Sequence, residues 1–246
     1  MNFYPILLRE IIILKRRFFR FGYLFSSMIM PLLYLIVFGL GLGKKINIEQ
    51  GSYFMFIVPG ICAMSSTMNS YMWLATSICV NRLHFKIIDE YLVSPITAMD
   101  IMLGEIFSGA IRGFFASSII FIFGAFFGAG FPQNPLFYLI LLLNCLIFAC
   151  FGVIAGFSAK AHEDIIAFSN FFIMPMTFFC GTFFPTNKLP HFIKIILYFL
   201  PLTHTNNCLR ASFSGQKIEI TSFIIILFFL MLFFNWGIFT IKKVQR

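Results

Sequence analysis

Hydrophobic residues gather along the chain in long runs that are nearly free of charge. Five runs contain no Asp, Glu, Lys or Arg and a sixth contains only Arg112; the six occupy residues 23–42, 53–80, 106–131, 136–159, 165–187 and 220–241. An α-helix of about 20 apolar residues is long enough to cross a hydrocarbon core of about 30 Å. The pattern therefore predicts an all-α integral membrane protein with six transmembrane helices in a single domain, residues 1–246.

The segment before the first run, residues 1–22, is basic and amphipathic. At about 100° per residue, Arg9, Arg16 and Arg20 share one stripe of a helix with Glu10 beside them, and Pro5 suits a first helical turn. The spacing predicts a helix that lies on the membrane surface and leads into the first span. A disordered basic tail is the alternative.

Composition supports a membrane protein and indicates its orientation. Hydrophobic residues make up 60% of the chain, charged residues 11%, and the net charge is +9. Nucleic acid is not an expected partner, because no segment supplies the basic face of a folded soluble domain, whereas membrane lipid is one. With the N-terminus inside, the inner connections hold eleven Lys and Arg residues and the outer ones six. This asymmetry predicts a multi-pass protein with cytoplasmic N- and C-termini.

A shorter apolar piece, residues 195–209, lies between the fifth and sixth runs. It is broken by Pro201 and carries His204, and it is too short to cross a bilayer. We expect residues 188–219 to form a re-entrant or interfacial region on the outer side.

The inner connection between the second and third runs, residues 81–105, is predicted to form two helices around an elbow. Thr97 and Asp100 are a Thr-x-x-Asp signal for a helix that starts at Ala98, and Pro95 pushes Ser94 out of helical geometry. The piece before the elbow has an apolar stripe beside two acids, formed by Ile87, Ile88, Asp89, Glu90, Tyr91 and Leu92. A short helix with such a stripe favours docking of a partner protein, and a helix lying back on the bilayer is the alternative.

Polar and aromatic residues inside the spans are candidates for contact with a solute. They are Asn69, Tyr71, Arg112, Asn170, Phe178 and Phe179. Helix packing is the alternative for the polar residues, and lipid contact is the alternative for the aromatic ones. Arg112 shares a helix face with Glu105, so we expect it to reach toward Glu105 or another inner acid, or else to contact an anionic substrate group.

No set of residues in the sequence suggests catalysis. His162, Glu163 and Asp164 stand together in "KAHED", but as consecutive residues of a tight loop that is expected to cap the fifth span. The stretch "GLGLGKKI" lacks the first glycine and the Ser or Thr of a phosphate loop. The six cysteines form no C-x-x-C pair and are interpreted as small hydrophobic residues. We expect no catalytic residue, no metal site and no cofactor bound by this chain.

Two stretches give the chain a resemblance to a known family. One is "DEYLVSPIT" followed by "LGE" in the inner loop, and the more specific one is "GTFFPTNKLPHFIKIILYFLPLTHTNNCLRASFSG" at residues 181–215. Together with the basic N-terminal helix and the six spans, they resemble the permease subunits of ABC-2 transporters over essentially the whole length. The residues are most similar to the nodulation-factor and drug-export branch. The resemblance implies the ABC-2, or type V exporter, fold.

The resemblance also implies partners and roles. Such permeases form dimers, usually of identical subunits, and a separate ABC ATP-binding subunit, which holds ATP and Mg, docks beneath each half. Residues 87–93 would be the coupling helix that fits a cleft in the ATP-binding subunit, with Pro95 beside it. The apolar pieces at 189–200 and after Pro201 would be outer re-entrant helices, and the residues of their gate would be Pro185, Pro190, Pro201 and His204.

The predicted function is that of the permease subunit of an ATP-driven exporter in the bacterial inner membrane. Its substrate would be amphipathic, such as a lipid-linked glycan, a drug or a lipid. An ATP-independent secondary transporter or channel is the alternative, and such a protein would be expected to have buried acids at mid-span for ion coupling. Apart from Arg112 the six runs contain no Asp, Glu, Lys or Arg, which favours the exporter.

Overall fold

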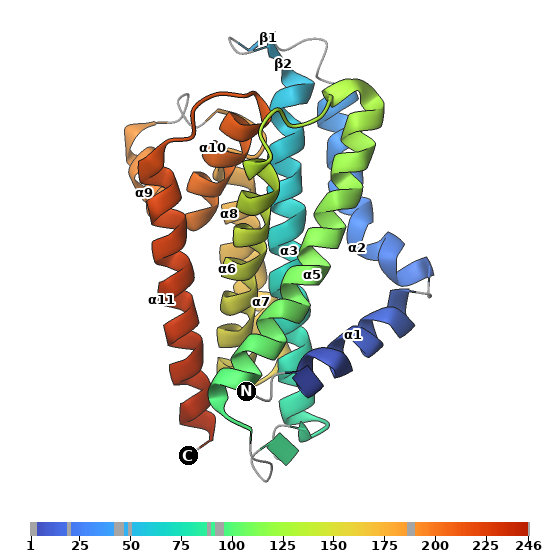
Figure 1. The fold of residues 1–246 in the computed structure, drawn as a ribbon, viewed down its shortest axis with the longest axis vertical. Coiled ribbons are helices and arrows are strands. Elements are labelled where there is room, and N and C mark those ends of the chain that lie inside the picture. The colour runs from blue at the N-terminus through green and yellow to red at the C-terminus, as the bar shows by residue number, and fades with distance from the viewer. Residues whose placement is uncertain are drawn as a thin grey trace.

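Long helices run side by side along one axis of the molecule (Figure 1). The computed structural model describes residues 4–18, 21–41, 47–48, 51–87, 90–91, 96–185 and 190–245. The long elements are α2 (Phe21–Tyr34) with the π-helical segment η1 (Leu35–Gly41), α3 (Tyr53–Leu83), α5 (Ala98–Gly124) with the π-helical segment η2 (Ala125–Ala129), α6 (Leu136–Ser158) and α11 (Ile220–Val244).

The other elements are shorter. Along the bundle α7 (His162–Phe168), η3 (Ser169–Ile173) and α8 (Met174–Phe179) follow one another, and α9 (His191–Tyr198) and α10 (Pro201–Phe213) lie toward the same end as the strands β1 (Asn47–Ile48) and β2 (Gly51–Ser52). The two strands pair antiparallel, with Asn47 opposite Ser52 and Ile48 opposite Gly51. We call this end of the bundle the hairpin end. The opposite end, where α11 finishes and residues 84–87 and 90–91 lie, is the terminal end (Figure 1).

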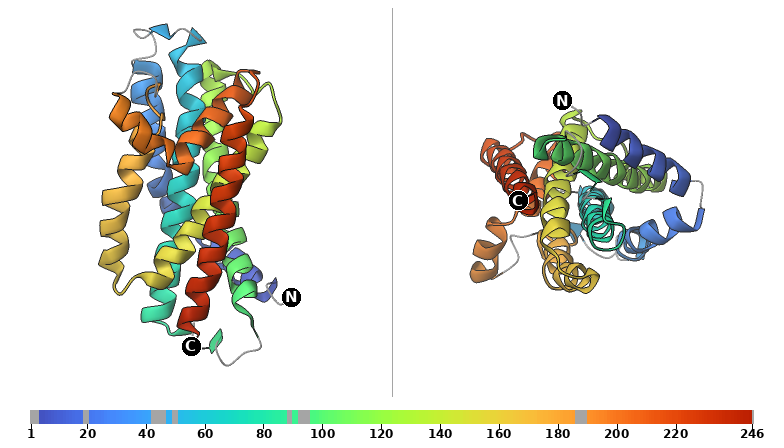
Figure 2. Two further views of the ribbon diagram at one scale, coloured as in Figure 1. Left: turned by 90° about the vertical axis from the view of Figure 1, so that its left-hand side faces the viewer. Right: turned by 90° about the horizontal axis from the view of Figure 1, so that it is seen from below.

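Helix α1 (Tyr4–Phe18) lies obliquely near the terminal end and packs on α5 (Figure 2). Its buried side includes Ile6, 2% exposed, and Glu10, 1% exposed, whereas Ile11 and Arg16 are exposed. A helix is therefore present where the basic amphipathic segment predicts one. Its placement on a membrane surface stays a prediction.

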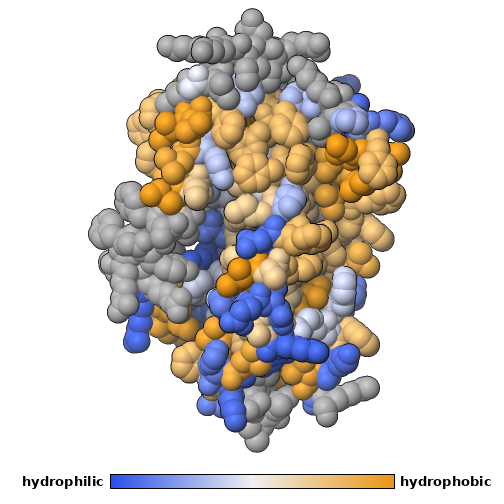
Figure 3. Space-filling model, turned by 180° about the vertical axis from the view of Figure 1, so that it is seen from behind, coloured by the Kyte–Doolittle hydropathy of each residue, from blue (hydrophilic) through white to orange (hydrophobic). Residues whose placement is uncertain are grey.

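Three of the described helices are long and apolar enough to cross a membrane, judged by length and composition, namely Ala98–Ala129, Leu136–Ser158 and Ile220–Val244. A shorter apolar helix, Met28–Gly39, lies within the first predicted run, and α3 covers the second run but carries the polar stretch "MSSTMNSYMW". Seen from behind, hydrophilic side chains gather mainly toward the terminal end, below a largely hydrophobic surface (Figure 3). Over the described residues the predicted all-α, apolar architecture is confirmed apart from the short β1–β2 hairpin. The count of six spans stays a prediction.

The helix start predicted at Ala98 is confirmed, and the predicted capping by the "KAHED" stretch is also found, but His162, Glu163 and Asp164 form the first turn of α7 and not a loop before it. Helix α5 begins at Ala98, where Asp100 N donates a hydrogen bond to Thr97 Oγ1 (3.2 Å) and Thr97 N donates one to Asp100 Oδ2 (3.3 Å). Before α7, the backbone N–H groups of Lys160 and Ala161 donate to Asp164 Oδ2 at 2.8 and 3.0 Å. In both places a carboxylate satisfies N–H groups at the start of a helix that have no partner within it.

Helices α3, α5 and α6 form the centre of the bundle and contact one another through small and hydroxyl-bearing residues. Asn144 of α6 is fully buried, and its Nδ2 donates to Ser66 Oγ (2.8 Å), Thr67 Oγ1 (3.0 Å) and the Ala63 carbonyl (3.3 Å) of α3. Hydroxyls of the polar stretch in α3 therefore join two helices, as hydroxyl-bearing residues commonly do between membrane helices. All six cysteines are buried and none forms a disulfide.

Asn144→Leu is expected to lower the free energy of unfolding by about 1 kcal/mol, because hydrogen bonds between membrane helices contribute about 0.6 kcal/mol on average and up to about 1.7 kcal/mol. The midpoint of thermal unfolding of the detergent-solubilised protein measures this loss. Asn235→Leu on α11 is the matched control, since exposed Asn235 hydrogen-bonds within its own helix, to the Met231 carbonyl. Equal midpoints for the two variants would show that Asn144 does not hold α6 against α3.

Candidate functional site

Four residues from three segments come together where α1 meets α5, and we call them the terminal-end cluster. They are Arg9 and Glu10 of α1, Tyr91 of the helical segment before α5, and Glu105 of α5. Arg9 Nη1 donates a hydrogen bond to Tyr91 Oη, and the guanidinium carbon of Arg9 lies 5.9 Å from the centroid of the Tyr91 ring. Arg9 Nη2 is 3.4 Å from Glu10 Oε1. The cluster therefore joins α1 to the helical residues 90–91 before α5.

The two carboxylates of the terminal-end cluster are buried. Glu10 is 1% exposed and Glu105 is 3% exposed. Glu105 lies within reach of the charges of both Glu10 and Arg9. A buried carboxylate costs free energy unless a cation or hydrogen-bond donors face it, and Arg9 supplies a cation that acts on both. The attraction between Arg9 of α1 and the buried Glu105 of α5 is screened little by water. It therefore couples the position of α1 to that of α5.

Tyr91 is half-buried, and burial raises the pKa of its hydroxyl, an effect that the neighbouring Arg9 charge partly offsets. The phenol therefore stays neutral at physiological pH and accepts the hydrogen bond from Arg9. A displacement of Tyr91 must then either move Arg9 or break this bond.

The structure describes part of the predicted docking helix. Ile87 and Tyr91 are half-buried and Glu90 is exposed. The remaining predicted docking residues, Ile88, Asp89, Leu92 and Pro95, lie outside the described residues. The exposed Glu90 carboxylate is accessible to a partner, and the adjacent Tyr91 is hydrogen-bonded to Arg9 of α1. The docking role of this segment stays a prediction.

Sequence reasoning missed the part that α1 plays in the cluster. The helical spacing of residues 1–22 predicts Glu10 beside the arginines on the charged side of the helix, whereas the structure buries Glu10 on the side that packs on α5. The available signal was a lone acid within a strongly basic segment, next to Arg9. That signal does not say which distant helix the acid faces.

Arg112 lies inside the bundle, 7% exposed, with its guanidinium carbon 3.8 Å from the centroid of the Trp73 ring of α3. A cation over a tryptophan face is stabilised by the electron density of the ring, by about 2 kcal/mol when water is excluded. The sequence suggests Glu105, another inner acid or a substrate anion as partners of Arg112. The structure adds Trp73, so this arginine helps to hold α5 against α3.

The other candidates for lining a pathway differ in exposure. Tyr71 is fully buried and Asn69 is 8% exposed. Phe178 is half-buried, and Asn170 and Phe179 are exposed on the segment formed by η3 and α8. Of these five, only Asn170 and Phe179 are openly accessible to a solute or a second subunit in a single chain. The lining role stays a prediction for all of them.

The predicted outer gate lies at the hairpin end. Its prolines comprise Pro201, which begins α10 and is buried, half-buried Pro185 and exposed Pro190. His204 is 1% exposed, with Nε2 2.8 Å from the Tyr198 carbonyl oxygen and Nδ1 3.2 Å from Ser222 Oγ. Because a carbonyl oxygen only accepts hydrogen bonds, Nε2 carries a proton. His204 thus ties α10 to the end of α9 and the start of α11.

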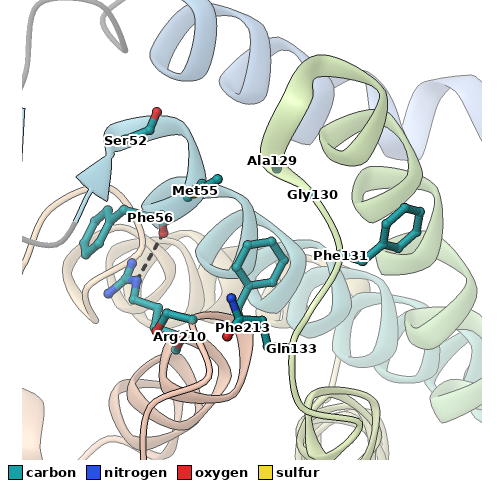
Figure 4. A pocket seen from close by; sticks show the side chains of 10 residues that line it. Ser52, Met55, Phe56, Ala129, Gly130, Phe131, Gln133, Arg210 and Phe213 are labelled. Carbon is teal, nitrogen blue, oxygen red and sulfur yellow. Dashed lines mark hydrogen bonds between the residues drawn. The ribbon is translucent and has the colours of Figure 1, made fainter.

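Arg210 of α10 is a further polar anchor at the hairpin end (Figure 4). Its Nε donates to the Phe56 carbonyl (3.2 Å), and its Nη2 donates to the carbonyls of Gly181 and Thr182. The guanidinium carbon lies 3.6 Å from the centroid of the Phe56 ring. These contacts join α10 to α3 and to the turn after α8. Arg210 lies in the stretch 181–215 that carries the family resemblance, but no contact of its side chain follows from the sequence.

The apolar helical bundle, with its charged groups at helix contacts and at its two ends, defines an integral membrane protein. Residues 3–214 match the family model described as ABC-2 type transporter, and the chain belongs to this family. The family that the inner loop and residues 181–215 resemble is therefore confirmed.

The relatives of the chain include transport proteins of the inner membrane. The inner membrane transport permease YadH of Escherichia coli (strain K12) is 30% identical over 206 residues, which cover 82% of this chain and 80% of that protein. Nodulation protein J of Rhizobium leguminosarum bv. viciae is 29% identical over 191 residues, covering 76% of this chain and 73% of that protein. Nodulation protein J of Rhizobium meliloti (strain 1021) is also 29% identical over 191 residues, covering 76% and 72%. The chain is an integral inner membrane protein and a transport permease rather than an enzyme.

Proposed function

We propose that the chain is the permease subunit of an ATP-driven exporter of the bacterial inner membrane. In this proposal it crosses the membrane six times with both termini in the cytoplasm, and it pairs with a second copy of itself. Separate ATP-binding subunits hold ATP and Mg and supply the energy. The exported substrate is amphipathic: a lipid-linked glycan, a drug or a lipid. Membership of the ABC-2 family supports the proposal, and the Arg9–Tyr91 contact is the observation that carries its mechanism.

Energy enters at the loop formed by residues 81–105. The ATP-binding subunit docks on the helix at 87–93, and closure of that subunit displaces Tyr91. The hydrogen bond between Arg9 and Tyr91 passes the displacement to α1, and the Arg9 charge links it to Glu10 and to Glu105 of α5. One small cluster thus connects the docking segment to two helices.

Helix α5 carries the displacement along the bundle. Its 27 residues form one helix, which is about 40 Å long at 1.5 Å per residue. The hydrogen bonds between Thr97 and Asp100 hold its start. Near the hairpin end the π-helical segment η2 contains Gly128 at φ 95°, where the helical geometry breaks. Because α5 is one continuous helix, a displacement of its Glu105 end moves its other end as well. That other end lies at the hairpin end (Figure 1), where α9 and α10 form the proposed gate.

Transport also requires two states of the pathway with different affinity for the substrate. Without that difference, ATP binding by the partner would not shift the population between the states. Asn170 and Phe179 are exposed on the segment formed by η3 and α8, and we place the pathway between this face and the second copy of the chain.

Co-purification with the ATP-binding subunit tests the docking step. We expect Glu90→Lys to reduce recovery of that subunit at least tenfold, because reversing an exposed charge in the docking segment replaces an attraction by a repulsion, and about 1.4 kcal/mol corresponds to a factor of ten. Glu163→Lys, which reverses another exposed acid at the start of α7, is the matched control. Equal recovery with both variants would place the docking surface elsewhere. Transport by the chain without ATP would instead support a secondary transporter or channel.

A further inference from the structure

A pocket of about 290 Å³ opens at the hairpin end of the bundle (Figure 4). Three segments enclose it: the start of α3, the loop after η2 and the end of α10. Its lining includes Ser52, Met55, Phe56, Phe131, Gln133 and Arg210. Backbone hydrogen bonds hold the loop against α10, because Gln133 N donates to the Phe213 carbonyl (3.3 Å) and Asn134 N donates to the Ser212 carbonyl (3.1 Å). The walls of the pocket are therefore fixed to one another.

Arg210 belongs to the lining of this pocket, and its positively charged guanidinium lies at one side of it, against the Phe56 ring (Figure 4). Its partners among the described residues are three backbone carbonyls and the Phe56 ring, and none of these carries a full negative charge. No described Asp or Glu forms an ion pair with it. Burial lowers the pKa of the guanidinium, as expected for a cation that its surroundings compensate incompletely. An anion in the pocket would supply the missing charge.

Arg210 also has hydrogen-bond donors left for a ligand. A guanidinium has five N–H donors, and the bonds to the described residues come from Nε and Nη2. The Nη1 donors make no hydrogen bond to the described part of the chain. Gln133 and Ser52 also belong to the lining of the pocket. Guanidinium donors suit phosphate and carboxylate oxygens in both charge and geometry.

The rest of the lining is largely apolar and lies beside exposed aromatic side chains. Met55 is 47% exposed and Phe131 is 75% exposed, and Phe126 of η2 is 85% exposed. Apolar walls with a few convergent polar groups are the usual form of a small-molecule site. The pocket therefore suits a molecule with an anionic group and an apolar body.

We propose that this pocket binds the phosphate or carboxylate group of an amphipathic anion, with Arg210 as its principal partner and Gln133 and Ser52 as supporting donors. A lipid headgroup and a free anion offer the same chemistry to Arg210. A lipid gains further contacts between its apolar body and Met55 and Phe131, so relative affinity distinguishes the two sources. The site does not depend on ATP or on export, and its loss would leave the proposed function standing.

Thermal unfolding of the full chain in a neutral detergent tests the site. The probes are dihexanoyl phosphatidylglycerol, inorganic phosphate and, as an uncharged control, dihexanoylglycerol, each titrated while the unfolding midpoint is recorded. A ligand that binds the folded state raises the midpoint in a concentration-dependent way. We expect phosphatidylglycerol to raise it at concentrations at least tenfold below those of dihexanoylglycerol. Inorganic phosphate acting at equal or lower concentration than the lipid would identify a free anion as the ligand.

Three variants locate the binding. Arg210→Gln removes the charge, and Met55→Trp fills the pocket from its exposed rim while keeping Arg210; both are expected to weaken binding at least tenfold. Lys217→Gln removes an exposed charge just after α10 and should bind within twofold of the unaltered chain. Because Arg210 also donates hydrogen bonds to three backbone carbonyls, Arg210→Gln can destabilise the fold. In that case the affinity of folded Met55→Trp for the anionic probes tests the site. Unchanged affinity in folded Met55→Trp, equal losses in Arg210→Gln and Lys217→Gln, or no response to either anionic probe would overturn the proposal.

Discussion

Replacing Arg9 by Ala is expected to reduce permease-stimulated ATPase activity of the assembled transporter at least tenfold while the ATP-binding subunit stays bound. The substitution removes the hydrogen bond to Tyr91 and the cation that acts on Glu10 and Glu105. A hydrogen bond that involves a charged group contributes about 1.5–3 kcal/mol, and about 1.4 kcal/mol corresponds to a factor of ten. The measurement is the ATPase rate of the reconstituted complex relative to that of the isolated ATP-binding subunit.

Two further variants make this result specific. Tyr91→Phe keeps the ring and removes the hydroxyl, and it should lower stimulation in the same direction but less. Combined with Arg9→Ala it should add little, since both substitutions break one contact. Arg16→Ala removes an exposed charge from the same helix and should behave like the unaltered chain. Full stimulation by a folded Arg9→Ala protein would mean that α1 does not carry the motion.

Gly152→Val is expected to lower the free energy of unfolding by about 3 kcal/mol or more. A Cβ at this position would lie 2.7 Å from the Tyr71 carbonyl oxygen and 3.1 Å from Leu74 Cβ of α3. Overpacking costs about 1–3 kcal/mol, and we expect a value at or above this range because a backbone atom cannot rotate away as a side chain can. The unfolding midpoint and the monodisperse fraction in detergent measure the loss.

Gly41→Val is the matched control for Gly152→Val. Among the residues that the structure describes, no atom lies within 4 Å of a Cβ added at Gly41, so this variant should unfold within a few degrees of the unaltered chain. If both variants unfolded at the same temperature, the close approach of α3 and α6 at Gly152 would not limit stability.

The helices could be predicted largely from short-range information. In lipid the backbone N–H and C=O groups must form hydrogen bonds within the protein. A long apolar run therefore almost always forms a helix, in which these bonds lie within the same segment. The start of α5 follows from Thr97 and Asp100, which are three residues apart and hydrogen-bond to one another. Asp164 caps the start of α7 through hydrogen bonds of the same local kind, although the sequence pattern predicts a loop for His162, Glu163 and Asp164. Such signals act over one helical turn and need no distant partner.

The candidate site could be predicted only in part. An apolar stripe beside acids points to Glu90 and Tyr91 as docking residues, because amphipathic spacing is visible along the chain. The partner of Tyr91 is Arg9, which is 82 residues away, and Arg210 bonds to the Phe56 carbonyl 154 residues away. No periodicity or motif relates such pairs, so the sequence does not reveal them.

By itself the sequence determined that this protein is an apolar helical membrane protein of the ABC-2 family and that α5 begins at Ala98, because hydrophobic length and helix capping are local properties. Only the tertiary structure decided which charges meet. In the folded chain Glu10 is buried on the side of α1 that packs on α5, and the Arg112 guanidinium lies over the Trp73 ring. Arg210 belongs to the lining of a pocket. A buried charge is stable only with a partner, and the helix that supplies the partner is chosen by how the whole bundle packs.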